Sequence, residues 1–175
     1  MFVANEGQQI SMEDFTFRLT AREQKMLEKS WAIPFLERIF PAIDEEPFSV
    51  LYSDNASRPN TPVNVLMGAL ILKEFFGQSD DDIRESLMFD IRYQVALHTT
   101  SFPEQPLSDR SLGRLRTRCT TYEEETGIDL IHDCVISLSR EIAEILVTTG
   151  LIGRKAKDAS RQDFPSSPFF LTFGH

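Results

Sequence analysis

The segment from residue 108 to residue 118 concentrates side chains suited to binding a polyanion. Arg110, Arg114 and Arg118 recur every four residues, so on a helix they share one face. Guanidinium groups bind phosphates and guanine edges in a bidentate way. The segment is therefore a candidate recognition helix for double-stranded DNA. Its candidate contact residues are Ser108, Arg110, Ser111, Arg114, Arg116 and Arg118.

One face of this helix must be anchored if the other is to present arginines. Leu112, Leu115 and Cys119 fall opposite the arginines and are expected to pack on a core, and Ser108 is expected to cap the helix. The alternative is a solvated face whose arginines pair with acidic residues, above all with the glutamates at 123–125. The pattern alone leaves both interpretations open.

The charge of the chain is unevenly distributed. The net charge of −9 argues against nucleic-acid binding by the molecule as a whole. Residues 108–120 nevertheless contain four arginines and one aspartate, and residues 150–175 are also basic, while the remaining segments are acidic. Because phosphate contacts are local, a small basic stripe on an acidic body can still bind DNA.

No other set of residues has the spacing that catalysis or metal binding requires. The histidines and cysteines do not have the spacing of a common zinc site. They are His98, Cys119, His132, Cys134 and His175. We expect the two cysteines to be buried thiols. The aspartates at 80–82 are interpreted as favourable charges at a helix start, with a metal site as the alternative. We therefore predict no enzymatic activity, no metal and no cofactor.

Caps and apolar spacing predict an all-α fold, a compact multi-helix domain with a helix-turn-helix-like recognition helix. Thr20 and Glu23 form a capping box, and Thr61 followed by Pro62 should cap a central helix that is apolar nearly all round. Loops are expected over 41–60 and 99–107. Helices are expected over 21–31, 63–76, 91–98, 109–122 and 129–147. Two further helices are expected to start near Pro34, which would lie in a first turn, and at residue 80.

The chain carries no membrane signal. No stretch reaches the roughly 18 consecutive apolar residues that a membrane helix needs. The first fifteen residues lack a basic start followed by an apolar run, so no signal peptide is expected. A cytoplasmic protein without a membrane partner is the expectation.

The order of several short motifs resembles the N-terminal domain of insertion-sequence transposases of the DDE class. The motifs are Leu51-Tyr52-Ser53, Arg58-Pro59, Pro62 before the apolar helix, Phe76-Gly77-Gln78-Ser79-Asp80, Arg92-Tyr93, and Ser108 to Arg118 with its core Arg114-Leu115-Arg116. The resemblance implies that this region binds the terminal inverted repeats of a transposable element.

In such transposases a catalytic domain follows, whose carboxylates hold divalent metals for attack on phosphate. Residues 153–158, which end at Asp158, resemble the approach to its first strand, but residues 159–175 do not continue the pattern. We therefore expect a truncated transposase without its catalytic domain. A frameshift near Lys157 is one hypothesis, and a free-standing binding protein or a separate open reading frame is the alternative.

These observations divide the chain into three parts and leave a second function open. Residues 1–18 are expected to be an N-terminal extension, 19–149 the helical domain, and 150–175 a tail that is disordered or a remnant of the catalytic domain. As the alternative function, the helix 129–147 could pair with a copy of itself or with intact transposase and act as a regulator. Its seam would be Cys134, Leu138, Ile142 and Ile145, although packing on its own core is the commoner use.

Overall fold

The computed structural model describes residues 2–5, 14–53, 60–102 and 104–148, and within them the fold is all-α, as predicted. Its α-helices are separated by short 3-10 and π turns, labelled η. The elements are η1 (Phe15–Arg18), α1 (Ala21–Glu28), α2 (Ala32–Pro34), η2 (Phe35–Ile39), η3 (Phe40–Ala42), η4 (Glu46–Leu51), α3 (Val63–Phe76), α4 (Asp80–Phe89), α5 (Ile91–Ala96), α6 (Ser111–Thr126) and α7 (Leu130–Thr148). None of these helices is both long and apolar enough to cross a membrane.

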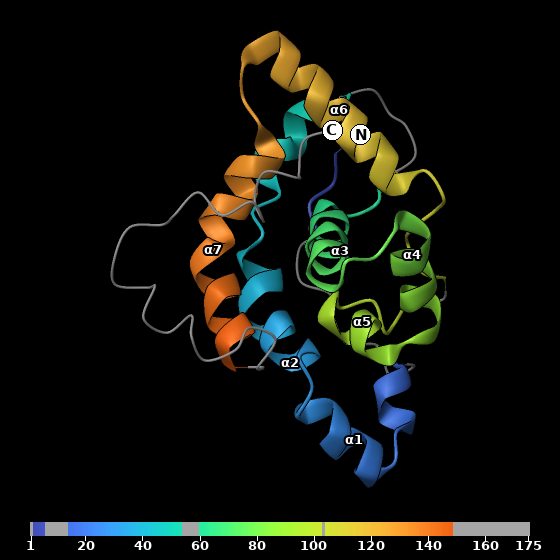
Figure 1. Cartoon of the computed structure of the whole chain (residues 1–175). Coiled ribbons are helices and arrows are strands. Elements are labelled where there is room, and N and C mark those ends of the chain that lie inside the picture. Colours follow the sequence, from blue (N-terminus) through green and yellow to red (C-terminus); the bar gives the residue numbers. More distant parts are fainter. Residues whose placement is uncertain (1, 6–13, 54–59, 103, 149–175) are drawn as a thin grey trace.

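The helix α3 is the centre of the molecule, as its apolar sequence predicts (Figure 1). Every residue from Val63 to Leu72 is buried. The helices α4 and α6 and the turn η3 pack on α3. A Cβ atom on Gly68 would lie 2.5 Å from Cδ2 of Leu97, so a glycine is what allows this close approach.

The start of α3 is capped differently from the prediction. The Thr61 hydroxyl donates to the backbone oxygen of Pro106 (3.4 Å) and does not cap the helix. The carboxylate of Glu45 accepts instead from the backbone amides of Val63 (2.9 Å) and Asn64 (3.1 Å). A negative charge at this helix end also interacts well with the helix dipole. Glu45, which lies eighteen positions before Val63, therefore caps the helix in place of Thr61.

The N-terminal third combines confirmed and wrong predictions. The Thr20–Glu23 capping box is present, although α1 ends at Glu28. Pro34 lies in the first turn of a helical stretch, as predicted. The expected loop over 41–60 is wrong in its first half, because η4 spans Glu46–Leu51 and buries Phe48 to 1% exposure. A buried aromatic ring outweighs the loop-forming residues around it.

Two other helices have different bounds from those predicted. The helix α5 ends at Ala96 because His98 has φ 54°, a left-handed conformation that a helix does not admit. The predicted cap of α6 is wrong: the Ser108 hydroxyl bonds to the Ser111 hydroxyl (2.8 Å), and the helix begins only at Ser111. It continues to Thr126, where Gly127 at φ 77° ends it.

The helix α7 packs within the chain, against η2 and α6. Val135, Leu138 and Ile142 are buried and Cys134 is half-buried, while the face with Asp133, Ser137, Arg140 and Glu144 is exposed. Two members of the expected oligomerisation seam, Leu138 and Ile142, therefore belong to the molecule's own core. The structure does not describe the side chain of Ile145. The motif Arg58-Pro59 and the predicted tail, residues 150–175 with Asp158 and His175, also lie outside the described residues.

Candidate nucleic-acid interface

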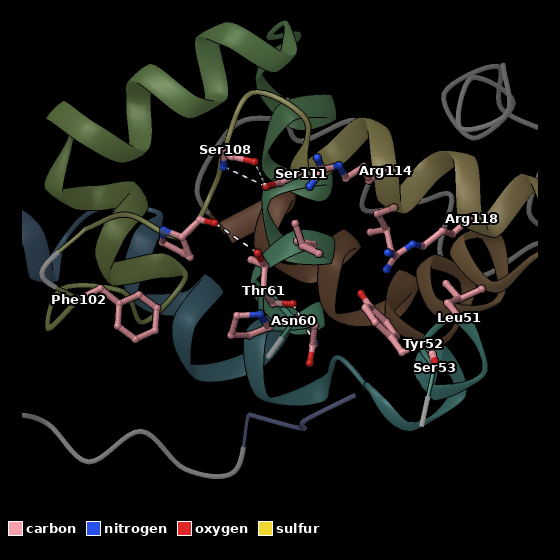
Figure 2. A pocket seen from close by; sticks show the side chains of 14 residues that line it. Leu51, Tyr52, Ser53, Asn60, Thr61, Phe102, Ser108, Ser111, Arg114 and Arg118 are labelled. Atoms are coloured by element: carbon pink, nitrogen blue, oxygen red, sulfur yellow. Dashed lines mark hydrogen bonds between the residues drawn. The ribbon is translucent and has the colours of Figure 1, made fainter. Parts of the chain in front are cut away.

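A groove of about 660 Å³ runs along the first half of α6. Its other walls are the end of η4, the residues immediately before α3, and the loop between α5 and α6. Figure 2 shows Phe102 at one end of the groove and Arg118 beside Tyr52 at the other, with Thr61 and Ser111 between them. Segments far apart in the sequence therefore build one concave surface.

The charges in the groove are of one sign. Arg114 and Arg118 line it, and none of the described lining residues carries a carboxylate. In a chain with a net charge of −9, a concave surface with two guanidinium groups and no acid is where an anion meets the least repulsion.

The guanidinium of Arg118 is held in place by an aromatic ring. It lies over Tyr52, 5.0 Å from the ring centroid, and the ring of Phe2 lies 5.7 Å from that of Tyr52. Burial raises the pKa of the Tyr52 phenol although the nearby Arg118 lowers it, so the hydroxyl stays protonated at neutral pH. A cation placed over an aromatic ring keeps its N–H groups available at the edges for a ligand.

Hydroxyl groups line the middle of the groove. The backbone amide of Ser108 donates to Oγ of Ser111 (2.9 Å), which also contacts the Ser108 hydroxyl. The Thr61 hydroxyl lies on the same surface and bonds to the loop at Pro106. Serine and threonine hydroxyls beside arginines are common donors to phosphate oxygens.

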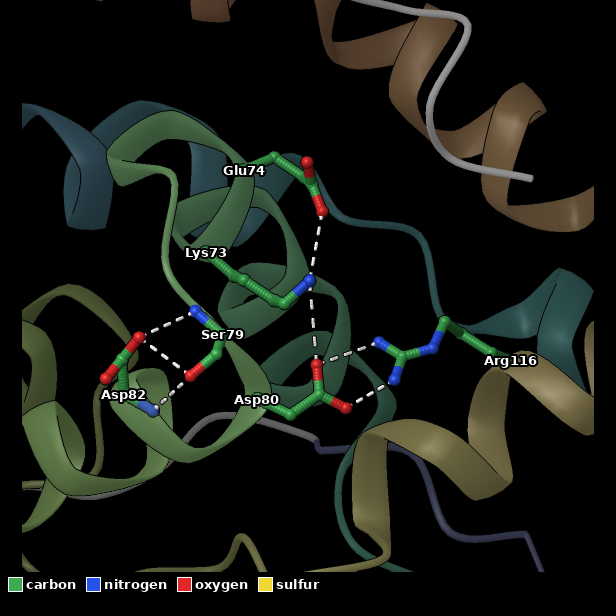
Figure 3. Close-up of polar contacts among 6 residues, drawn as sticks. All are labelled: Lys73, Glu74, Ser79, Asp80, Asp82 and Arg116. Carbon is green, nitrogen blue, oxygen red and sulfur yellow. Dashed lines mark hydrogen bonds and ion pairs between the residues drawn. The ribbon is translucent and has the colours of Figure 1, made fainter. Parts of the chain in front are cut away.

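Arg116 points away from the groove and makes an ion pair instead (Figure 3). Its Nη1 donates to Oδ1 of Asp80 (3.1 Å), and Nζ of Lys73 lies 3.6 Å from the same oxygen. The hydrogen bond from Arg116 is the main cause that lowers the pKa of Asp80. The alternative of pairing with the glutamates at 123–125 concerns the face of Arg110, Arg114 and Arg118, to which Arg116 does not belong.

The structure divides the six predicted contact residues into three groups. Ser108, Ser111, Arg114 and Arg118 line the groove. Arg110 is exposed at the N-cap of α6 but is not among the lining residues, and Arg116 is paired with Asp80. The other predicted face is confirmed, because Leu112, Leu115 and Cys119 are buried.

Two aromatic residues of the groove were not among the predicted contact residues. Tyr52 belongs to a motif of the family resemblance, but its position under Arg118 is a long-range contact without a local pattern. Phe102 lies in the loop before α6 and carries no periodic signal. The resemblance was the one signal that could have pointed to Tyr52.

Cys119 is buried and Cys134 is half-buried. Burial raises the pKa of the Cys119 thiol to about 12 and that of Cys134 to about 11, so both are protonated at neutral pH. In the part of the chain that the structure describes, no group of three or more His, Cys, Asp or Glu side chains could hold a metal ion.

Residues 21–118 match the family described as Transposase domain (DUF772). The match covers more than half of the chain and extends from α1 into the basic half of α6. The chain therefore belongs to this transposase-domain family. No curated protein and no solved structure matches it.

Proposed function

We propose that this chain binds double-stranded DNA, the terminal inverted repeats of a transposable element, through the groove and the exposed arginines of α6. The observation that carries the proposal is the groove itself, which has Arg114 and Arg118 and no carboxylate among its described residues, in a strongly acidic chain. Membership of a transposase-domain family supports DNA as the polyanion.

The charge order along α6 supports the same proposal. The helix carries Arg110 at its N-cap and Arg114 just inside, and the glutamates at 123–125 lie in its last turn. A helix dipole favours the opposite order, with acids at the N-terminus and bases at the C-terminus. The arrangement costs the isolated helix stability, but it places the arginines where the backbone amides of the N-terminus also favour a phosphate.

The finer assignment follows the family resemblance. We propose that residues 19–149 form the helical N-terminal domain of a DDE-type transposase, with α6 as its helix-turn-helix-like recognition helix, and that the activity of this chain is binding rather than cleavage. Residues 1–18 would be an extension that packs on this domain, since the backbone amides of Val3 and Asn5 donate to Asn60 (2.8 Å) and Glu45 (2.9 Å). Residues 150–175 would be the tail.

The test is fluorescence anisotropy on a labelled duplex of the inverted repeats that flank the gene, with a scrambled duplex as control, across a salt series. Three phosphate contacts predict a log–log slope of roughly −3, by about 0.9 per phosphate. The variant Arg114→Ala/Arg118→Ala should lose repeat-selective binding and make the slope shallower by about two.

The matched control is Arg22→Ala/Arg140→Ala, which removes the same charge from exposed positions on α1 and α7. This control should bind as the unmodified chain does. Equal weakening by both double variants would reduce the effect to net charge, and binding no tighter than to the scrambled duplex would refute the proposal.

A further inference from the structure

The groove has the opposite shape from a surface that enters the major groove of DNA. A recognition helix protrudes, because the major groove is itself a channel about 12 Å wide that receives the helix. Here Arg114 and Arg118 line a hollow in the protein, closed on its far side by Tyr52 and by residues 60–62. A duplex can lie along the exposed face of α6, which carries Arg110, Arg114 and Arg118, while the hollow beside that face is a separate place for an unpaired strand.

The size and the lining residues of the groove suit a single nucleotide strand. Its volume of about 660 Å³ lies within the range of roughly 300–1,000 Å³ of sites that hold small organic molecules. Arg118 and Tyr52 lie at one end and Phe102 at the other, with the hydroxyls of Thr61, Ser108 and Ser111 between them (Figure 2). Grooves for single-stranded nucleic acid combine these elements, cations along the backbone and an aromatic ring for a base.

The two aromatic rings have different roles. The ring of Tyr52 already has two neighbours, because the guanidinium of Arg118 lies over it and the ring of Phe2 lies beside it. Among the described residues, no other aromatic ring packs against that of Phe102. Phe102 therefore offers a ring for a base to stack on, while Tyr52 orients the guanidinium of Arg118.

We propose that the groove binds unpaired terminal nucleotides of a DNA end, with a base on Phe102 and the sugar–phosphate backbone along Arg114 and Arg118. This rests on the proposed function and deepens it. The duplex part lies on the exposed rim at Arg110, and the frayed or overhanging strand enters the hollow. The protein would then distinguish a DNA end that carries an overhang from a blunt one.

The experiment compares two labelled duplexes of the same inverted-repeat sequence, one blunt and one with a short single-stranded overhang. The unmodified chain should bind the overhanging duplex roughly fivefold tighter or more, as one stacked base predicts. The variant Phe102→Leu should abolish this preference, because it should weaken binding of the overhanging duplex more than binding of the blunt one, and it should leave the melting temperature unchanged. The control Phe89→Leu, at an aromatic that is 81% exposed on α4, should change neither.

The outcomes separate the two proposals. Equal affinity for both duplexes, or a Phe102→Leu variant that keeps the preference, overturns the unpaired-strand site and leaves duplex binding in place. A variant that weakens both duplexes equally also overturns it, because Phe102 would then support the groove rather than a base. Failure of the unmodified chain to bind either duplex overturns both proposals.

Discussion

The helices α4 and α6 differ in the sign of the charges at their N-termini. In α4, Ser79 and Asp82 form a capping box and Asp80–Asp82 occupy the first turn, where the helix dipole favours carboxylates. In α6 no side chain caps the start, arginines lie near it, and glutamates end the helix. The aspartates at the start of α4 stabilise that helix. The arginines at the start of α6 oppose its dipole, and Arg114 and Arg118 line the groove where a ligand can reach them.

The largest effect should come from the anchored face of α6. Leu115 is 2% exposed and packs in the core next to the exposed Arg114. Leu115→Ala should lower the free energy of unfolding by about 2–5 kcal/mol, because it leaves a cavity. Arg114→Ala should change it by less than about 0.5 kcal/mol, as a surface substitution does. Urea denaturation of both variants checks this, and equal losses would mean that Arg114 supports the fold.

The caps of the two helices should differ next. Ser79→Ala removes a hydroxyl that accepts from the backbone amide of Asp82 (3.1 Å), and should cost about 1 kcal/mol. Ser108→Ala removes only a contact to another hydroxyl (2.8 Å) and should cost less than about 0.5 kcal/mol. Thermal unfolding of the two variants gives the comparison. A loss at Ser108 as large as that at Ser79 would show that α6 is capped after all.

The smallest of the three effects concerns the ion pair that joins the helices. The hydrogen bond from Arg116 lowers the pKa of Asp80 below its usual 3.8. A lowered folded pKa stabilises the fold fully above the unfolded value, and the stabilisation is lost as the pH falls through the folded value. Asp80→Asn should therefore cost about 0.5–1 kcal/mol at pH 7, and this cost should shrink as the pH falls below 3.8. Urea denaturation at pH 7 and pH 2 measures this, and a cost as large at pH 2 as at pH 7 would point to packing instead.

A feature can be predicted from the sequence when the residues that form it are close together in the chain. The burial of α3, the two-sided pattern of α6 and the capping box of Thr20 with Glu23 depend on neighbours within one or two turns, and the predictions for them are confirmed. The cap of α3 comes from Glu45, and the partner of Arg116 lies 36 positions away. Such contacts leave no periodicity, so only the fold reveals them.

The same distinction explains the groove. Its two arginines and two of its serines come from residues 108–118, and spacing alone identifies them as candidates. Its remaining walls come from three other segments whose aromatic and hydroxyl groups meet only after folding. For this reason the sequence predicts only the arginine face of one helix, whereas the structure shows the hollow beside it.

The most direct test of the central claim measures DNA affinity and melting temperature on one variant, Arg114→Glu, with Arg140→Glu on α7 as the matched charge change. If the arginines of α6 serve a ligand rather than the fold, Arg114→Glu should weaken repeat binding by at least about tenfold, since a carboxylate repels phosphate. Its melting temperature should stay the same or rise, because the new carboxylate lies near a helix N-terminus. Arg140→Glu should leave binding unchanged. A variant that loses melting temperature together with binding, or that keeps its affinity, would contradict the account.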